Sequence, residues 1–395
     1  MPLRDRGGLR VRHGGNLSFP AVPASVVLVV PSGQLISLQH VDSIVPACPD
    51  AGQDVMTRIH SATTVAAAAL LLALAGCSAS SPAPSSLADA ETPSSEAGYP
   101  VSIENCGRTL TFDAAPEHVV SLWQAPTEMM LALGLGDHLV ARAGDYAAYP
   151  ASLAEEAEEI PSIGSAMGWP SKEVLLSEGA DLVLGQSLEG YAFDTSQGYA
   201  SVEQIENSGA QVYGANICDA DGGDAIAMTL DTPIDTLRDL GVIFGVSDRA
   251  EELIADLEQD KQTVIDAVEG KDTVEVAFYN GGEGPLIVLA GGIYDDAIET
   301  AGGRNVFPAD SVYVSKEDFA ASDAEVVLVG TFEGQDYDTL RAYLEQTFPD
   351  LPAVQAGNLV EIPVDDTDAS VTVMRGLTEI ANALHSELEL TVPAP

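Results

Sequence analysis

One stretch of the chain occurs twice, and the two copies align without a gap. The first copy begins with Ser171-Lys172-Glu173 and the second with Ser315-Lys316-Glu317. Each copy has the pattern of a serine helix cap, an acidic first turn, a short amphipathic helix and then a fully apolar strand. Two chance helix starts are the alternative, but the matching downstream strand favours a true repeat. The repeat therefore predicts two similar lobes, each with one glutamate on its surface at the start of a helix.

Length and charge limit the class of function. A chain of 395 residues is long enough for two domains, each with its own core. Residues 1–76 contain five basic and four acidic residues, so the rest of the chain carries a net charge of −46. Such a body repels phosphate backbones and anionic lipid surfaces, which excludes nucleic-acid binding. We interpret the acidity as a means of keeping the surface solvated, with a cationic ligand as the alternative.

Residues 56–76 have the pattern of a secretory signal. A basic start at Arg58 is followed by an unbroken apolar run from Val65 to Ala75, which is too short to span a bilayer. The run ends in Leu74-Ala75-Gly76-Cys77, which resembles the lipobox of bacterial lipoproteins. That resemblance implies acylation of Cys77, and hence a protein lipid-anchored to the outer face of the cell membrane.

The segments on either side of this signal lack the pattern of a folded domain. Residues 1–55 show no helical or strand period, so we interpret them as an upstream extension before the true initiator Met56; a functional extension is the alternative. Residues 77–98 are rich in Ser, Pro and Ala, which predicts a flexible tether. Cys48 lies in the extension and Cys77 in the lipobox, so two cysteines remain in the rest of the chain. In an exported protein we expect these two, Cys106 and Cys218, to form a disulfide; two buried free thiols are the alternative.

Short apolar strands and amphipathic helices alternate through the rest of the chain, which predicts α/β lobes with mostly parallel sheets. The longest periodic element is the helix over Ser247–Val268, which we expect Ser247 to cap and Gly270 to end. It lies between the two copies of the repeat. We therefore expect a rigid helix between two lobes, with boundaries at 99–246, 247–270 and 271–395.

Several motifs along residues 99–388 together resemble a known family. Asn105-Cys106-Gly107-Arg108, the run 115–122 and the run 127–134 look like the first lobe of substrate-binding proteins from iron-siderophore and cobalamin ABC importers. The runs 239–246 and 301–307 look like the linker and second lobe of that family. His118 and Ala180 depart from the family pattern, which has arginine and proline there.

The resemblance implies two Rossmann-like lobes joined by one long α-helix, with the ligand cleft between the lobes. It implies an extracytoplasmic, monomeric binding protein that captures a ferric siderophore or similar chelate and delivers it to an ABC permease and its ATPase. Cobalamin, haem or another cofactor is the alternative ligand. In this family one glutamate per lobe docks on the permease, and Glu173 and Glu317 match those positions.

Ligands of parallel α/β lobes contact the loops that follow the strands. In those loops, aromatic rings with a few polar groups suit a large organic chelate. The predicted ligand-binding residues are Trp123, Met167, Trp169, Tyr191, Asn216, Tyr279, Asn280, Arg304, Phe332 and Asp366.

We expect no resident cofactor, no metal bound directly by the protein and no catalysis. His118, His138 and His385 lie in separate elements without ligand spacing, and the chain has neither a nucleophile elbow nor a phosphate loop. An α/β enzyme and a surface lipoprotein without a transport role are the rival hypotheses. Only Arg142, Arg304 and Arg375 are expected to approach the cleft, so the sequence favours a neutral or cationic chelate over a trianionic catecholate.

Overall fold

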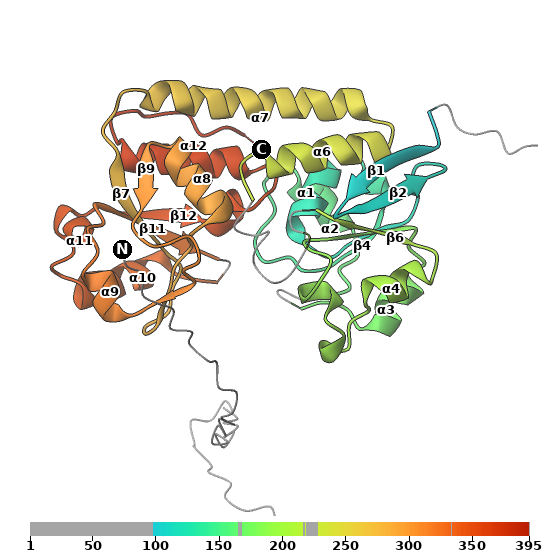
Figure 1. The fold of residues 1–395 in the computed structure, drawn as a ribbon, viewed down its shortest axis with the longest axis horizontal. Helices are drawn as coiled ribbons and strands as arrows, with labels where there is room; N and C mark the ends of the chain where they lie inside the picture. The colour runs from blue at the N-terminus through green and yellow to red at the C-terminus, as the bar shows by residue number, and fades with distance from the viewer. Residues whose placement is uncertain (1–97, 165–167, 216–217, 219–227, 333, 395) are drawn as a thin grey trace, which may run out of the picture. The chain divides into compact units, whose positions relative to one another are not determined.

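The computed structural model describes residues 98–394 except 165–167, 216–217, 219–227 and 333. The signal segment, Cys77 and the tether therefore lie outside the described residues. Residues 85–395 form one compact unit, whose described part contains two four-stranded parallel sheets. We call residues 98–246 the N-lobe and residues 271–394 the C-lobe (Figure 1).

The N-lobe sheet has the strand order β4-β3-β5-β6, and every neighbouring pair is parallel. An antiparallel hairpin, β1–β2, precedes it. The elements in chain order up to β6 are β1 (Val101–Asn105), β2 (Arg108–Phe112), β3 (Val119–Ser121), α1 (Gln124–Ala132), η1 (Gly136–His138), β4 (Leu139–Arg142), α2 (Ala154–Glu159), α3 (Lys172–Ser177), β5 (Leu182–Gly185), η2 (Tyr191–Phe193), η3 (Thr195–Gln197), α4 (Val202–Glu206) and β6 (Gln211–Gly214).

The C-lobe sheet has the order β12-β11-β7-β9, again parallel throughout. Its elements are β7 (Val274–Tyr279), β8 (Leu286–Ile287), α8 (Gly292–Thr300), β9 (Gly303–Asn305), β10 (Tyr313–Val314), α9 (Lys316–Ala320), β11 (Val326–Thr331), α10 (Tyr337–Thr347), α11 (Pro352–Ala356), β12 (Leu359–Pro363), η4 (Val364–Thr367) and α12 (Val373–Leu384). The predicted α/β class with mostly parallel sheets is confirmed.

Both sheets are covered on two faces, as parallel sheets require. In β5, Leu182 and Leu184 join one apolar cluster while Val183 joins another. In β11, Leu328 joins the first cluster and Val327 joins a third one on the opposite face. This alternation explains why both strands read as unbroken apolar runs in the sequence.

The sequence repeat corresponds to equivalent structures in the two lobes. Ser171 caps α3 by accepting the Val174 N–H, and Ser315 caps α9 by accepting the Asp318 N–H. The fifth residue of each copy, Leu175 or Phe319, is buried. Each helix is followed by a central strand of its sheet, β5 or β11. The two predicted glutamate-bearing helix starts are therefore structurally equivalent.

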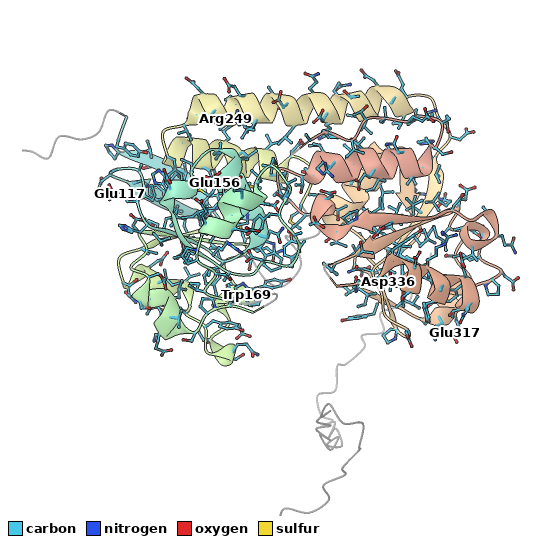
Figure 2. The ribbon with its side chains drawn as sticks, turned by 180° about the vertical axis from the view of Figure 1, so that it is seen from behind. Glu117, Glu156, Trp169, Arg249, Glu317 and Asp336 are labelled. Carbon is cyan, nitrogen blue, oxygen red and sulfur yellow. A yellow bond between two sulfur atoms is a disulfide. The ribbon has the colours of Figure 1, made fainter. Side chains whose placement is uncertain are left out.

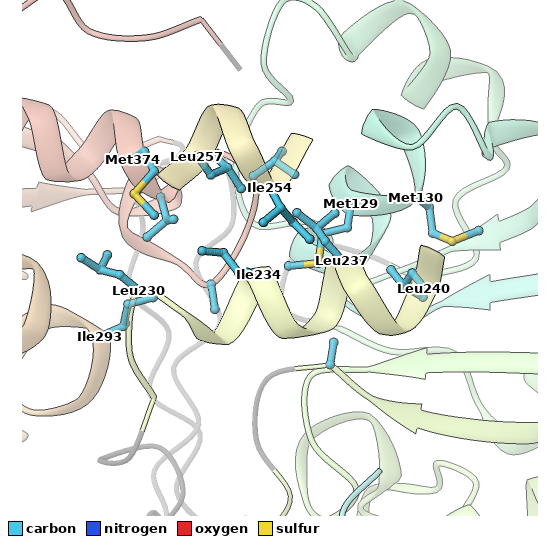
Figure 3. Packing of buried hydrophobic residues seen from close by; sticks show 14 of the residues in the cluster. Met129, Met130, Leu230, Ile234, Leu237, Leu240, Ile254, Leu257, Ile293 and Met374 are labelled. Atoms are coloured by element: carbon cyan, nitrogen blue, oxygen red, sulfur yellow. The ribbon is translucent and has the colours of Figure 1, made fainter. Parts of the chain in front are cut away.

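A continuous apolar core connects the lobes beneath the long helix. Helix α6 (Thr232–Ile243) precedes α7 (Ser247–Val268), and α7 lies over both α6 and α12 (Figure 1). Figure 3 shows Ile254 and Leu257 of α7 among side chains of α1, α6 and α12, including Met129, Leu237 and Met374. Because α7 buries apolar residues against both lobes, it resists relative motion of the lobes.

Some local expectations were incomplete. Helices α2 and α11 were not predicted, and Ser247 is the first residue of α7, not its cap: Val246 holds the cap position without a side-chain bond. In the described part of the chain, no helix is both long enough and apolar enough to cross a membrane.

The hairpin is attached to the last strand of the N-lobe sheet. A disulfide joins Cys106, in the hairpin turn, to Cys218, after β6, as the sequence predicted. Beside it, the Asn105 amide donates to the Gly214 carbonyl at 2.9 Å and accepts from the Gly214 N–H at 2.9 Å. Arg108 donates to the Val212 carbonyl at 2.6 Å. The covalent link and the hydrogen bonds therefore hold the same two segments together.

Candidate ligand-binding site

An aromatic cluster forms where loops of the two lobes meet. Trp123 follows β3, and its ring centroid lies 4.9 Å from that of Tyr146 and 6.1 Å from that of Trp169. Tyr191 is 6.3 Å from Trp123 and 6.1 Å from Trp169, and its side chain is 45% exposed. Phe332, which follows β11 in the C-lobe, packs against the same group. We call Trp123, Tyr146, Trp169, Tyr191 and Phe332 the aromatic cluster.

The carboxylate of Asp368 connects the C-lobe to this cluster. Its Oδ2 accepts the indole N–H of Trp123 at 3.0 Å and the hydroxyl of Tyr146, both from the N-lobe. Its Oδ1 accepts the backbone N–H of Ala369 at 2.8 Å. Burial, followed by the nearby charge of Asp368, raises the pKa of the Tyr146 hydroxyl well above its usual value, so Tyr146 remains a donor.

Local packing fixes the segment that carries Asp368. Thr372 donates to the Asp365 carbonyl at 3.0 Å, and Arg375 of α12 pairs with Asp366 at 3.1 Å. A Cβ at Gly376 would lie 2.0 Å from the Asp366 carbonyl oxygen, so only glycine lets α12 approach η4 this closely. Asp368 is therefore held by a supported backbone and not by a free loop.

A second buried network lies behind Trp123. The Gln124 Oε1 accepts the N–H groups of Tyr146 at 3.0 Å and Ala147 at 2.9 Å, which positions the loop after β4. The Gln124 amide donates to Glu128 at 2.8 Å, and Ser370 of the C-lobe donates to the other oxygen of Glu128. Burial raises the pKa of Glu128 to about 8, and the charges of Asp368 and Asp365 act in the same direction.

Glu128 makes stability depend on pH. Its pKa of about 8 in the folded protein exceeds the ordinary value of 4.5, so the folded state holds a proton that the unfolded chain releases. The free energy of unfolding should therefore fall as pH rises from 5 to 8, by about 3 kcal/mol from this group. Asp365, whose pKa burial raises to about 6, and Glu379, whose pKa burial raises to about 7, add a slope of the same sign.

We expect Glu128→Gln to reduce this pH dependence, because glutamine stays neutral and retains hydrogen-bonding groups for Gln124 and Ser370. Urea unfolding at pH 5 and pH 8 measures the effect. The variant should lose clearly less stability than the wild type between the two values. Equal losses in the two proteins would show that Glu128 is ionised in the folded state.

The predicted site residues divide into four groups. Trp123, Trp169, Tyr191 and Phe332 come together in the aromatic cluster. Asn280 follows β7 and is 7% exposed, and its Oδ1 has no hydrogen-bond partner among the described residues. Met167 and Asn216 lie outside the described residues.

Tyr279, Arg304 and Asp366 do not have the positions expected of ligand contacts. Tyr279 is 1% exposed and packs in the C-lobe core, because alternation along β7 turns its side chain toward Phe319. Arg304 pairs with Glu275 at 2.5 Å, at the start of β7 and not at its carboxyl end. Asp366 is buried in its ion pair with Arg375.

The site also contains residues that the sequence reasoning missed. Tyr146 follows β4 at the same sheet edge as Trp123, so its place after a predicted strand was an available signal. Asp368 had no such signal, since it is one of 61 acidic residues and only the fold brings it to Trp123. Gln124 and Glu128 lie on α1, and only their buried hydrogen bonds to the Tyr146 backbone and to Ser370 identify them as part of the site.

The basic side chains that were expected near the cleft form ion pairs and do not contact the aromatic cluster. Arg142 and Arg375, which were expected near the cleft, pair with Asp145 and Asp366, and Arg304 lies at the other end of its sheet. Among the described residues, no lysine or arginine makes a contact with the aromatic cluster in any hydrogen bond, ion pair or cation–π interaction. The short segments of the lobes that the structure does not describe contain no lysine or arginine in their sequence.

The two glutamates of the repeat lie on a different surface. Glu173 and Glu317 are exposed in the first turns of α3 and α9, on the side of the lobes away from α7 (Figures 1 and 2). Hydrogen bonds from its own backbone N–H and from Ser171 lower the pKa of Glu173. No pocket described for these lobes includes either residue.

The geometry defines a class of protein. Two parallel-sheet lobes, joined by a long helix and facing each other with aromatic side chains at their strand ends, are built to hold a ligand between them. A narrow crevice, with no room for a water molecule, lies among Trp123, Trp169, Tyr191, Gln186 and Phe193. The described part of the chain has no group of three His, Cys, Asp or Glu side chains placed to hold a metal ion.

Comparison with known proteins identifies the family. The family model described as "Periplasmic binding protein" matches residues 119–365, so the chain belongs to this family, which implies an extracytoplasmic location. No curated protein matches the chain.

Solved structures share the fold. A periplasmic binding protein from Veillonella parvula is 21% identical, with a TM-score of 0.63, covering 72% of this chain and 97% of its own. A protein of an ABC-type Fe3+-hydroxamate transport system from Saccharomonospora viridis is 27% identical, with a TM-score of 0.59, covering 73% and 99%. The vitamin B12 binding protein of Vibrio cholerae is 19% identical, with a TM-score of 0.53, covering 70% and 99%.

Proposed function

We propose that the chain is the ligand-capturing component of an ABC importer and that its ligand is a metal chelate, specifically a ferric siderophore. The aromatic cluster carries this proposal. It combines side chains of both lobes at the ends of parallel strands, and it offers flat apolar faces beside a few hydrogen-bonding groups. Such a surface suits the apolar rim of a large organic chelate.

A ferric trihydroxamate is the favoured ligand. The absence of a free basic side chain at the described part of the cluster disfavours a trianionic ferric catecholate, whose desolvation needs positive charge nearby. The similarity to the Saccharomonospora viridis protein, whose name refers to Fe3+-hydroxamate transport, supports the same ligand class. Haem and vitamin B12 are the second candidates, because proteins of the same fold are named for binding them and aromatic faces also stack on porphyrins and corrins.

The remaining parts of the chain fit this role. Residues 56–76 would direct export, Cys77 would be acylated, and residues 77–98 would tether the lobes to the membrane surface. Glu173 and Glu317 would dock on a permease that works with an ATPase. We propose a monomeric binding protein without catalytic activity.

Tryptophan fluorescence tests the ligand class directly, because both tryptophans of the chain, Trp123 and Trp169, lie in the aromatic cluster. We expect a ferric trihydroxamate to quench the fluorescence with a dissociation constant of about 1 μM or lower, and a ferric tris-catecholate to bind at least about tenfold more weakly. Cobalamin and haem complete the panel. Tighter binding of the catecholate would contradict the charge argument, and preferential binding of cobalamin or haem would replace the siderophore as ligand.

A further inference from the structure

Asp368 is a carboxylate without a counter-ion. It is half-buried, and it forms no ion pair with any described residue, whereas its neighbour Asp366 pairs with Arg375. Its contacts are hydrogen bonds from neutral donors: the Trp123 indole, the Tyr146 hydroxyl and the Ala369 backbone. A half-buried charge held only by neutral donors favours a cation beside it.

Aromatic rings surround this carboxylate. Trp123 and Tyr146 contact it directly, and Trp169 and Tyr191 continue the surface from Trp123. Tyr294 of α8 is also near, since the Asp368 charge, after burial, raises the pKa of its hydroxyl. The faces of tryptophan and tyrosine attract organic cations, and a carboxylate among them adds a direct opposite charge.

The nearby charges are almost all negative. Asp365, Asp366 and Asp368 lie in this segment, whereas the raised pKa of Glu128 leaves that group protonated and neutral near pH 7. Among the described residues, the one basic group that interacts with them, Arg375, is held by Asp366 and by the Pro393 carbonyl at 2.9 Å. The local field therefore favours a positive group on whatever binds here.

We propose that Asp368, together with Trp123 and Tyr146, forms a subsite for an alkylammonium group of the ligand. This inference rests on the proposed function as a chelate-binding protein and specifies the ligand further: a chelate with a cationic amine. An ammonium group fits better than a bare metal ion, because aromatic faces attract an organic cation, whereas the Asp368 carboxylate and the Tyr146 hydroxyl are too few oxygen ligands to complete the coordination of a metal.

Simple probes test the subsite without any chelate. Tryptophan fluorescence is titrated with n-butylammonium, with n-butanol and with n-butanesulfonate at matched ionic strength. We expect a saturable response in the millimolar range to the ammonium alone. The same response to butanol, or no response to the ammonium, would overturn the proposal.

The variant Asp368→Asn keeps an acceptor for Trp123 and Tyr146 while removing the charge, so the ammonium response should be lost. The matched control is Asp350→Asn, which removes an exposed charge at the turn before α11 and should respond as the wild type does. An unchanged ammonium response in a folded Asp368→Asn variant would contradict the proposal. If the Asp368→Asn variant does not fold, the fluorescence responses of the wild type to n-butylammonium and to n-butanol still test the proposal.

A chelate pair separates this inference from the proposed function. Ferrioxamine B carries a terminal ammonium, and its N-acetyl derivative is the same ferric trihydroxamate without that charge. The wild type should bind the cationic form about tenfold more tightly, and Asp368→Asn should bind both alike. If the wild type binds both forms equally, the subsite is wrong although the function stands. If neither form binds but butylammonium does, the hydroxamate ligand is wrong and the ammonium subsite stands.

Discussion

Replacing Glu173 and Glu317 together by alanine is expected to abolish chelate uptake by cells, while the purified variant binds the chelate within a few fold of the wild type. Both side chains are exposed at equivalent helix starts, and neither contacts the aromatic cluster in the described structure. Hydrogen bonds from its own backbone N–H, and then from the Ser171 hydroxyl, lower the pKa of Glu173.

The size of the expected effect follows from the hydrogen bonds to the permease that we propose for these glutamates and that the alanine variant would lack. Each charge-assisted hydrogen bond to a partner arginine is worth about 1.5–3 kcal/mol, so removing both glutamates should weaken docking by at least about two orders of magnitude. The neighbouring surface also suits an interface, because Val174 is 41% exposed and Tyr313 is 65% exposed. Exposed apolar side chains close in sequence to each glutamate suit an interface that excludes water from such hydrogen bonds.

Uptake of the iron-loaded chelate in a strain lacking the endogenous protein, complemented with each variant, measures docking. The matched control removes Glu258 and Glu269, two exposed glutamates of the α7 segment, and should transport normally. A collapse of chelate affinity in the Glu173→Ala/Glu317→Ala variant would instead place these residues in the ligand site. Normal uptake by this variant would show that Glu173 and Glu317 are not part of the docking surface.

The sequence was sufficient for the architecture, because periodicity and capping are local. The bounds of α7 agree with the predicted range, and Ser171 and Ser315 cap their helices as expected. Helix α2 escaped prediction because its sequence Ala-Glu-Glu-Ala-Glu-Glu has no apolar stripe.

The site was predictable only in part, because contacts between lobes depend on the fold. Aromatic residues after strands gave Trp123, Trp169 and Phe332, yet the same reasoning chose Tyr279, whose side chain faces the core. Asp368 becomes distinctive only through its hydrogen bond to Trp123, 245 positions away in the chain. Among so many acidic residues, the position after a strand led us to predict Asp366 as a ligand contact. In the structure Asp366 forms an ion pair with Arg375.

Removing the disulfide is the second change with a large expected effect. The bond closes a loop of 112 residues between Cys106 and Cys218, and the loop-entropy argument gives about 4–5 kcal/mol as an upper figure. The variant Cys106→Ser/Cys218→Ser should therefore lose several kcal/mol in urea unfolding. Wild-type protein unfolded in the presence of a reductant should show the same loss.

The hydrogen bonds beside the disulfide help to decide whether removing it acts on the unfolded chain or on the docking of the hairpin in the folded protein. The Asn105 and Arg108 hydrogen bonds to β6 remain when the sulfurs are removed, so the hairpin should stay docked and chelate affinity should change little. Asn105→Ala serves as the comparison, since it breaks the Asn105 hydrogen bonds but leaves the covalent link. If the cysteine variant loses less than about 1 kcal/mol while Asn105→Ala loses more, hydrogen bonding rather than the covalent link is what secures the hairpin. A large loss in the cysteine variant with affinity retained would assign the disulfide to stability alone, the role expected of such a bond in an exported protein.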